Sequence, residues 1–172
     1  MHVIVIPYQA IWPRIYEQEK MAIQEILQDE IVDIYHIGST AVSQLAAKPI
    51  IDIMVAIKNI SAVDQYNSQF DKLGYEPMGE YGIKGRRSFR KGKGERTHHI
   101  HIFESTNQYD IKRHLAVRDY LRNHPDVAQA YGLLKQQLAL QYPFDIEGYC
   151  DGKNAFVKKL EQDALSWYFH QS

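Results

Sequence analysis

The sequence predicts an α+β fold, in which a mixed β-sheet flanked by helices is followed by a helical C-terminal third. Three observations support this prediction. Apolar, β-branched runs typical of strands occur at residues 31–37 and 50–57. Helical spacing of apolar residues marks the N-terminal segment and most of the chain after residue 107. No repeat, low-complexity tract or linker interrupts the chain, so a single domain over residues 1–172 is expected.

The first part of the chain alternates between helical and extended patterns. Residues 12–28 form an amphipathic pattern, and Pro13 suits the first turn of a helix. Residues 31–37 then run as a strand into a turn at 38–40, where polar residues favour the start of a short helix. The segment 50–57 is so apolar that it should be a buried, central strand.

The middle of the chain completes the sheet. Residues 61–73 have helical spacing, and residues 75–78 return to extended structure. The stretch 81–103 predicts a hairpin with its turn at residues 92–94 and its return strand at 98–103, which makes the sheet mixed. Three helices are predicted to complete the chain: residues 107–123, 125–141 and 151–168.

Composition narrows the class of protein. A 172-residue chain buries about 70% of its unfolded surface, so a substantial core is available. The chain has 20 Lys plus Arg against 21 Asp plus Glu, and this net charge of -1 argues against nucleic acid or a membrane as a partner. Cys150 is the only cysteine, which excludes an internal disulfide and a thiolate zinc cage. With no apolar stretch of about 18 residues, a soluble cytoplasmic protein is expected.

The strongest functional pattern joins a Gly-Ser turn to an acid on the next strand. Gly38 allows a close backbone approach to a phosphate, and Ser39 and Thr40 offer hydroxyls and amides at a helix start. Asp52 can hold a divalent cation that bridges phosphate oxygens. The alternative is purely structural: a capped helix and a strand acid bonded to its neighbours.

Several runs of residues resemble the GrpB family (UPF0157), and they cover nearly the whole chain in order. The runs are HIGSTAV at 36–42, AKPIIDI at 47–53, HHIH at 98–101, RDYLR at 118–122, His-Pro at 124–125, and residues 131–138. The resemblance implies a nucleotidyltransferase-like fold of the DNA polymerase beta type. It also implies a nucleotide or other phosphate-containing small molecule as ligand. Some relatives are joined to dephospho-CoA kinase, which implies that enzyme as a partner.

The chain departs from the nucleotidyltransferase pattern at one position. That pattern has two acids separated by one residue after the Gly-Ser pair. Asp52 matches the first acid, but Met54 stands at the second, and a thioether does not bind a hard cation as a carboxylate does. Two explanations stay open: other ligands complete the site, or the protein binds its ligand without catalysing a reaction.

Two histidines are the candidate replacements for the missing acid. His99 and His101 are two residues apart on a predicted strand and therefore share one face, while His98 should point elsewhere. With Asp52 they would make a three-ligand site for a divalent metal such as Mg, Mn or Zn. The alternative is that histidines on a half-exposed strand only form hydrogen bonds.

Basic residues supply further candidate phosphate ligands. The predicted hairpin carries many cations, of which Arg87 is the candidate donor, although a solvated hairpin is the alternative. Arg118 falls on an apolar helical stripe and needs an anionic partner, either an internal carboxylate or the phosphate. Lys48 precedes the buried strand, and Lys153 begins a helical stripe from which it can reach a site or extend to solvent.

Three functions follow as hypotheses. In the first, the protein transfers a nucleotidyl group, with Asp52, Ser39 and His36 as catalytic residues and His36 as acid or base. For His36 a place in the core is the alternative. The second is a non-catalytic module that binds a nucleotide or a CoA precursor, or serves a partner enzyme. The third is metal-dependent hydrolysis of a small phosphorylated compound.

Overall fold

The computed structural model describes residues 2–170, which divide into two compact units. Unit 1 consists, among the described residues, of 2–10, 38–49 and 112–170. Unit 2 consists of residues 11–37 and 50–111. Because the chain passes between the units several times, neither is a continuous stretch of sequence, and the single domain over residues 1–172 stays a prediction.

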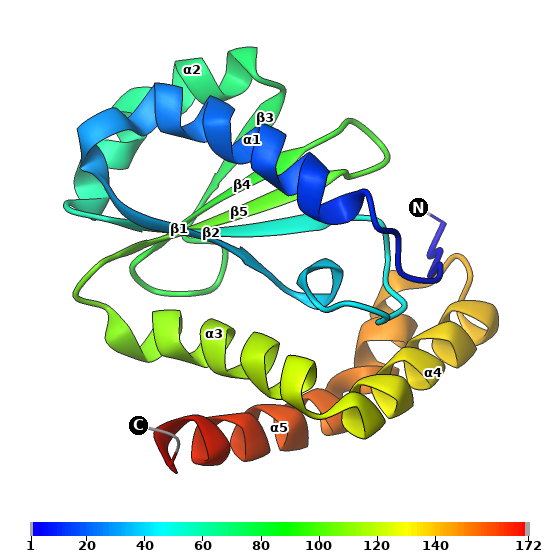
Figure 1. Ribbon diagram of the computed structural model, residues 1–172. Helices are drawn as coiled ribbons and strands as arrows, with labels where there is room; N and C mark the ends of the chain where they lie inside the picture. The colour runs from blue at the N-terminus through cyan, green and yellow to red at the C-terminus, as the bar shows by residue number, and fades with distance from the viewer. Residues whose placement is uncertain (1, 171–172) are drawn as a thin grey trace. The chain divides into compact units, whose positions relative to one another are not determined.

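Unit 2 is built on a five-stranded sheet in the order β1-β2-β5-β4-β3 (Figure 1). The strands are β1 Ile31–Ile37, β2 Ile51–Ile57, β3 Tyr75–Gly79, β4 Arg86–Lys91 and β5 His98–Glu104. The pair β2 and β5 is parallel, whereas all other neighbours are antiparallel. The predicted mixed sheet and the hairpin of β4 and β5 are therefore confirmed.

Helices cover one face of this sheet. Figure 1 shows α1 (Trp12–Leu27) and α2 (Asn67–Lys72) on the same side of the strands. Residues 61–73, predicted as one helix, begin instead as the 3-10 helix η3 (Ile60–Tyr66). The Asn59 side chain accepts a hydrogen bond from the Ser61 amide at its start, and the segment is rich in residues of modest helix propensity, which explains the difference.

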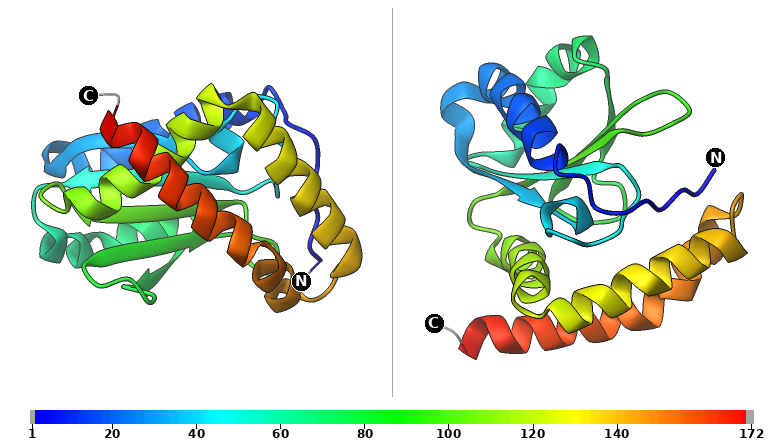
Figure 2. Two further views of the ribbon diagram at one scale, coloured as in Figure 1. Left: turned by 90° about the horizontal axis from the view of Figure 1, so that it is seen from below. Right: turned by 45° about the vertical axis from the view of Figure 1, so that its right-hand side comes forward.

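Unit 1 is mainly helical. It holds α4 (Pro125–Gln141), α5 (Ile146–His170) and the part of α3 (Gln108–Asn123) from Lys112 on. Figure 2 shows α4 and α5 side by side. Helix α5 starts five residues before the predicted residue 151, in a stretch with two glycines. Tight packing explains the second of these glycines, because a Cβ at Gly152 would lie 2.4 Å from Leu138 Cδ2.

One core cluster of unit 1 joins the 38–49 segment with the three helices: Val42, Leu45, Leu121, Ala128, Tyr131 and Leu160. These side chains pack the 38–49 segment against the helices of unit 1. Within residues 2–170, the helices are all too short or too polar to cross a membrane. The observed architecture is therefore α+β, with a mixed sheet, flanking helices and a helical C-terminal part, as predicted.

Candidate functional site

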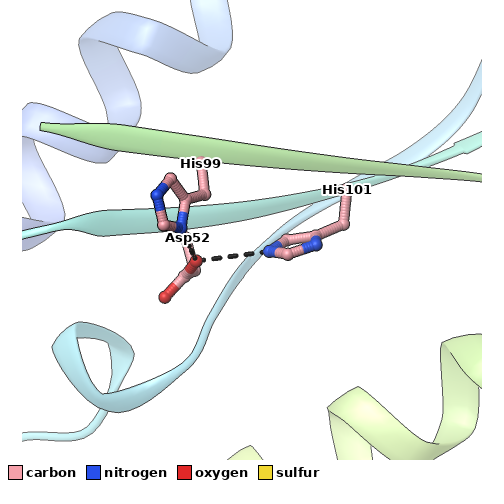
Figure 3. A group of neighbouring side chains, drawn as sticks. All are labelled: Asp52, His99 and His101. Atoms are coloured by element: carbon pink, nitrogen blue, oxygen red, sulfur yellow. Dashed lines mark hydrogen bonds and ion pairs between the residues drawn. The ribbon is translucent and has the colours of Figure 1, made fainter. Parts of the chain in front are cut away.

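The register of the two parallel strands brings one carboxylate and two imidazoles to the same face of the sheet. Asp52 on β2 lies opposite His99 on β5, and Met54 lies opposite His101. Because side chains alternate along a strand, Asp52, His99 and His101 all project from one face. Figure 3 shows the two rings turned toward the carboxylate. The Asp52 Oδ1 lies 3.5 Å from His99 Nδ1 and 3.3 Å from His101 Nε2.

These distances suit a shared cation. The three ligand atoms all lie within 4.8 Å of one another. Bonds of about 2.1 Å at tetrahedral angles place two ligand atoms roughly 3.4 Å apart, close to both measured separations. The side chains of Asp52, His99 and His101 are 29, 22 and 16% exposed, so an ion from solvent can reach them. The Asp52 oxygen and the two histidine nitrogens that face it are therefore spaced to bind a divalent metal.

The carboxylate is held in its charged form. Burial by itself would raise the pKa of Asp52, but hydrogen bonds from His101 and His99, with their charges, outweigh it and hold that pKa well below its ordinary value. Asp52 is therefore an anion at neutral pH. An anionic oxygen is what a hard or borderline cation requires.

The ring nitrogens that face away from Asp52, His101 Nδ1 and His99 Nε2, have different neighbours. Arg86 Nη1 lies 3.1 Å from His101 Nδ1, and a guanidinium can only donate, so Nδ1 must accept. A neutral His101 consequently carries its proton on Nε2 and donates it to Asp52. His99 Nε2 is buried without a hydrogen-bond partner. Metal-bound histidines usually donate their outer N–H to an acceptor, so a metal here requires Arg86 to release His101.

Met54 cannot complete the site. Its side chain is fully buried, with an exposure of 0%, in a strand whose two faces are both covered. His101 is its direct neighbour on β5 and extends to Asp52 instead. The position of the second acid is thus filled by a core residue, while an imidazole from the next strand reaches the carboxylate.

Two predicted site residues lie on the other face of the sheet. His36 on β1 is paired with Ile53, whereas Asp52 is paired with Ile37, so His36 and Asp52 point in opposite directions. His36 is buried and stacks on the ring of Tyr16 at 4.7 Å. The structure therefore does not bring His36 together with Asp52, and it gives His36 the buried position that was considered as the alternative.

Arg87 is also turned away from Asp52. It is paired with Ile102 on β5 and forms an ion pair with Asp64 at 2.9 Å. Its neighbour Arg86 is the arginine that shares the face of His101. As predicted, His98 points elsewhere, and its Nε2 lies 3.4 Å from the buried Glu19.

Most hairpin cations have partners within the unit, so the free cationic array considered as a phosphate site is absent from the described residues. Lys91 donates to Glu19 at 3.1 Å, and Arg96 to Glu76 at 3.2 Å. Arg90 lies over the ring of Tyr81. Most of the hairpin charges are therefore engaged by other groups of unit 2.

The Gly-Ser turn belongs to unit 1 and is not the start of an α-helix. Gly38 has a φ of 74°, which favours glycine, and residues Ser39–Ala41 form a single 3-10 turn. No side chain caps this turn, and Thr40 is buried. The expected helix start at Ser39 is therefore only a 3-10 turn, and a turn of three residues does not add up enough aligned peptide dipoles to attract an anion.

Ser39 instead contacts a buried lysine. Lys135 on α4 is 2% exposed, and its Nζ donates to Ser39 Oγ at 2.8 Å and lies 4.3 Å from the centre of the Tyr131 ring. Burial, followed by the positive charges of Lys153 and Lys48, lowers the pKa of Lys135 to about 7. Two predicted phosphate ligands, Lys48 and Lys153, are therefore near a third lysine that was not predicted.

The sequence does contain a signal for Lys135. The buried residues of α4 recur at helical spacing: Ala128, Tyr131, Gly132, Lys135, Leu138 and Ala139. A lysine in an otherwise apolar stripe is the same anomaly that identified Arg118 on α3. Arg118 itself forms an ion pair with Asp119 at 2.9 Å, in agreement with the internal pairing considered above.

A cavity of about 620 Å³ lies within unit 1, and none of the predicted site residues lines it. Its lining includes Tyr8, Gln44, Arg122 and Gln136. The Arg122 guanidinium donates from Nε and Nη2 to the Ala41 carbonyl at 3.0 and 2.8 Å. Because Arg122 is engaged by the backbone, its role there is to hold the 38–49 segment.

Comparison with known proteins gives consistent matches over almost the whole chain. A family model described as "GrpB protein" matches residues 2–163. The UPF0157 protein YqkA of Bacillus subtilis is 45% identical over 163 residues, covering 95% of this chain and 47% of that protein, so the chain spans about half the length of this relative. Glutamate-rich protein GrpB of Alkalihalophilus pseudofirmus is 32% identical, covering 92% of this chain and 93% of that protein. The crystal structure of GrpB from Enterococcus faecalis matches with a TM-score of 0.94 and 48% identity, over 96% of this chain and 99% of that one.

Proposed function

The chain belongs to the GrpB family, and from that premise we propose that it binds a nucleotide or a related phosphate compound together with a divalent metal. The observation that carries the proposal is the convergence of Asp52, His99 and His101 on one face of the sheet. A divalent cation held by these three residues supplies positive charge for phosphate oxygens. The mixed sheet with its helices is compatible with a nucleotidyltransferase-like fold of the DNA polymerase beta type, which we propose as its class.

The protein's own residues have distinct tasks in this proposal. Asp52 provides the anionic ligand, and its low pKa keeps it ionised across the physiological range. His101 replaces the second acid; Arg86 holds its ring in the metal-free protein and releases Nδ1 when a metal binds Nε2. His99 completes the set from the same strand. With these residues in place, the proposed activity is the transfer of a nucleotidyl group.

A second candidate is binding without catalysis, as an accessory module for a nucleotide or CoA precursor. The observation that favours it is the complete burial of Met54, which leaves one carboxylate where the transferase pattern has two. In that case a partner enzyme such as dephospho-CoA kinase uses the bound compound. The use of imidazoles favours a softer metal than Mg²⁺ and, with it, the third candidate, hydrolysis of a phosphorylated compound. All three are proposed to act in the cytoplasm.

Ligand-dependent unfolding tests the shared part of these candidates. Wild-type protein, first stripped with EDTA, is heated with ATP and with Zn²⁺, Mn²⁺ or Mg²⁺, separately and combined. A ligand that binds only the folded state adds about 2.7 kcal/mol of stability at a hundredfold excess over its Kd. We expect a metal-dependent rise in Tm that Asp52→Asn abolishes, because the amide keeps the shape but removes the charge.

The matched control is Asp33→Asn on the neighbouring strand β1, an exposed acid outside the cluster. It should respond to metal as the wild type does. Equal responses of the Asp52 and Asp33 variants would show that Asp52 is structural. Pyrophosphate release from ATP separates the enzyme from the binding module, and release of inorganic phosphate from a monoester indicates the hydrolase.

A further inference from the structure

We infer that unit 1 contains a binding site for a phosphoryl anion, such as a diphosphate, built from one serine and three lysines on three segments: Ser39, Lys48, Lys135 and Lys153. The inference rests on the proposed function for the class of ligand. The geometry of this site does not involve the proposed metal ligands, since all four of its residues lie in unit 1 and the metal ligands lie in unit 2.

The centre of the site is the buried ammonium of Lys135. It lies 2.8 Å from Ser39 Oγ and over the Tyr131 ring, and both are neutral groups. A buried charge without a counter-charge is costly. Burial and the positive charges of Lys153 and Lys48 lower the pKa of Lys135. The ligand-free arrangement therefore favours the arrival of negative charge.

Two more ammonium groups stand at a common aromatic ring. Lys48 Nζ and Lys153 Nζ lie 5.2 and 5.1 Å from the centre of the Tyr149 ring. The two lysines and Ser39 are partly exposed, so a ligand from solvent can reach the cluster. Cation–π contact favours each ammonium, but it leaves two like charges at one ring. An anion between them would offset that repulsion.

The same ring carries an unsatisfied donor. The Tyr149 hydroxyl is buried and has no hydrogen-bond partner, and burial raises the pKa of Tyr149, so the group keeps its proton. Unpaired buried hydroxyls are rare and usually have a reason. The cluster thus offers ammonium and hydroxyl donors. A phosphate monoester, with a charge of about -1.5 to -2 at pH 7 and several acceptor oxygens, matches such a set.

Calorimetric titration with inorganic pyrophosphate in the presence of EDTA tests the site. We expect wild-type protein to bind, Lys135→Met to weaken binding at least tenfold, and Ser39→Ala to weaken it several-fold. The matched control is Lys158→Met, which removes the same charge from an exposed lysine of α5 and should change the affinity less than threefold. Phosphate and sulfate, titrated in parallel, separate recognition of a diphosphate from a general anion effect.

Asp52→Asn separates this inference from the proposed function. If that variant loses metal binding but keeps pyrophosphate binding, both stand as independent sites. If the wild type ignores metals yet binds pyrophosphate, only the proposed metal fails. The inference is overturned if wild-type protein binds none of the three anions, or if Lys135→Met and Lys158→Met bind equally while circular dichroism shows both folded.

Discussion

At the residue scale, the protonation of Asp52, His99 and His101, here called the Asp52 cluster, depends on what contacts the ring nitrogen of each histidine that faces away from Asp52. Arg86 is buried and is held by the backbone carbonyls of Glu80 and Tyr81 as well as by His101. It can only donate, so it determines which nitrogen of His101 accepts. The hydrogen bond from Arg86 thereby determines which nitrogen of a neutral His101 carries the proton in the metal-free protein.

This hydrogen bond predicts the tautomer of His101. In protein stripped of metal, neutral His101 should carry its proton on Nε2, because Arg86 occupies Nδ1. Two-bond ¹⁵N–¹H correlation spectra of selectively labelled histidine distinguish the two tautomers. Addition of Zn²⁺ should then change the Nε2 resonance. A proton found on Nδ1 would contradict the assignment of Arg86 as the positioning residue.

Lys135 predicts a second measurable effect, a rise of stability with pH. Its pKa is about 7 in the folded protein against 10.5 for the ordinary side chain. Between these values the unfolded state binds more protons, so the free energy of unfolding increases as the pH rises and loses this gain as the pH falls toward 7. From pH 7 to 9 the rise is about 2 kcal/mol.

Urea unfolding at the two pH values provides the measurement. Lys135→Met should remove the rise, because Met has no proton to exchange, whereas Lys158→Met should keep it. An identical pH response in both variants would indicate that another group dominates. Pyrophosphate should reduce the rise, since a bound anion favours the charged lysine.

At the scale of elements, β2 explains why the second acid is absent. Ile53 and Met54 are both 0% exposed although they point to opposite faces, so the strand is buried on both sides. Alternation along the strand gives Asp52 and Met54 the same face. Full burial on that face could not be predicted, because it depends on what packs against the sheet.

Restoring the acid tests this explanation. Met54→Asp should destabilise the protein by more than about 4 kcal/mol, since it leaves a cavity and buries a carboxylate. Met54→Leu keeps the volume and should cost less than about 1.5 kcal/mol. Chemical denaturation of both variants gives the comparison. A well-folded Met54→Asp protein with a stronger metal response would instead show that the position still accepts a ligand.

At the scale of the whole molecule, the two candidate sites belong to different units. The Asp52 cluster lies in unit 2, and the Lys135 cluster in unit 1. The chain runs directly from β1 of unit 2 into the Gly38 turn of unit 1. Ligands for the two sites should therefore protect different amides.

Hydrogen exchange with mass spectrometry can separate these effects. Zn²⁺ should slow exchange mainly in β2 and β5, whereas pyrophosphate with EDTA should slow it in residues 38–49, α4 and the first turns of α5. Asp52→Asn should erase only the first pattern, and Lys135→Met only the second. Protection by pyrophosphate confined to the β4–β5 hairpin would place the anion on its arginines and contradict the unit 1 site.

The amino-acid sequence by itself determined most of the elements, the mixed sheet and the shared face of His99 and His101. Local periodicity gives the elements, and alternation along one strand gives the shared face. The parallel pairing of β2 with β5, which placed both histidines beside Asp52, belongs to the tertiary structure. Only the tertiary structure decided which faces meet. The register between strands turned His36 and Arg87 away from Asp52. The packing of α4 and α5 with residues 38–49 gathered Lys48, Lys135 and Lys153, because contact between distant segments depends on how their buried stripes fit together.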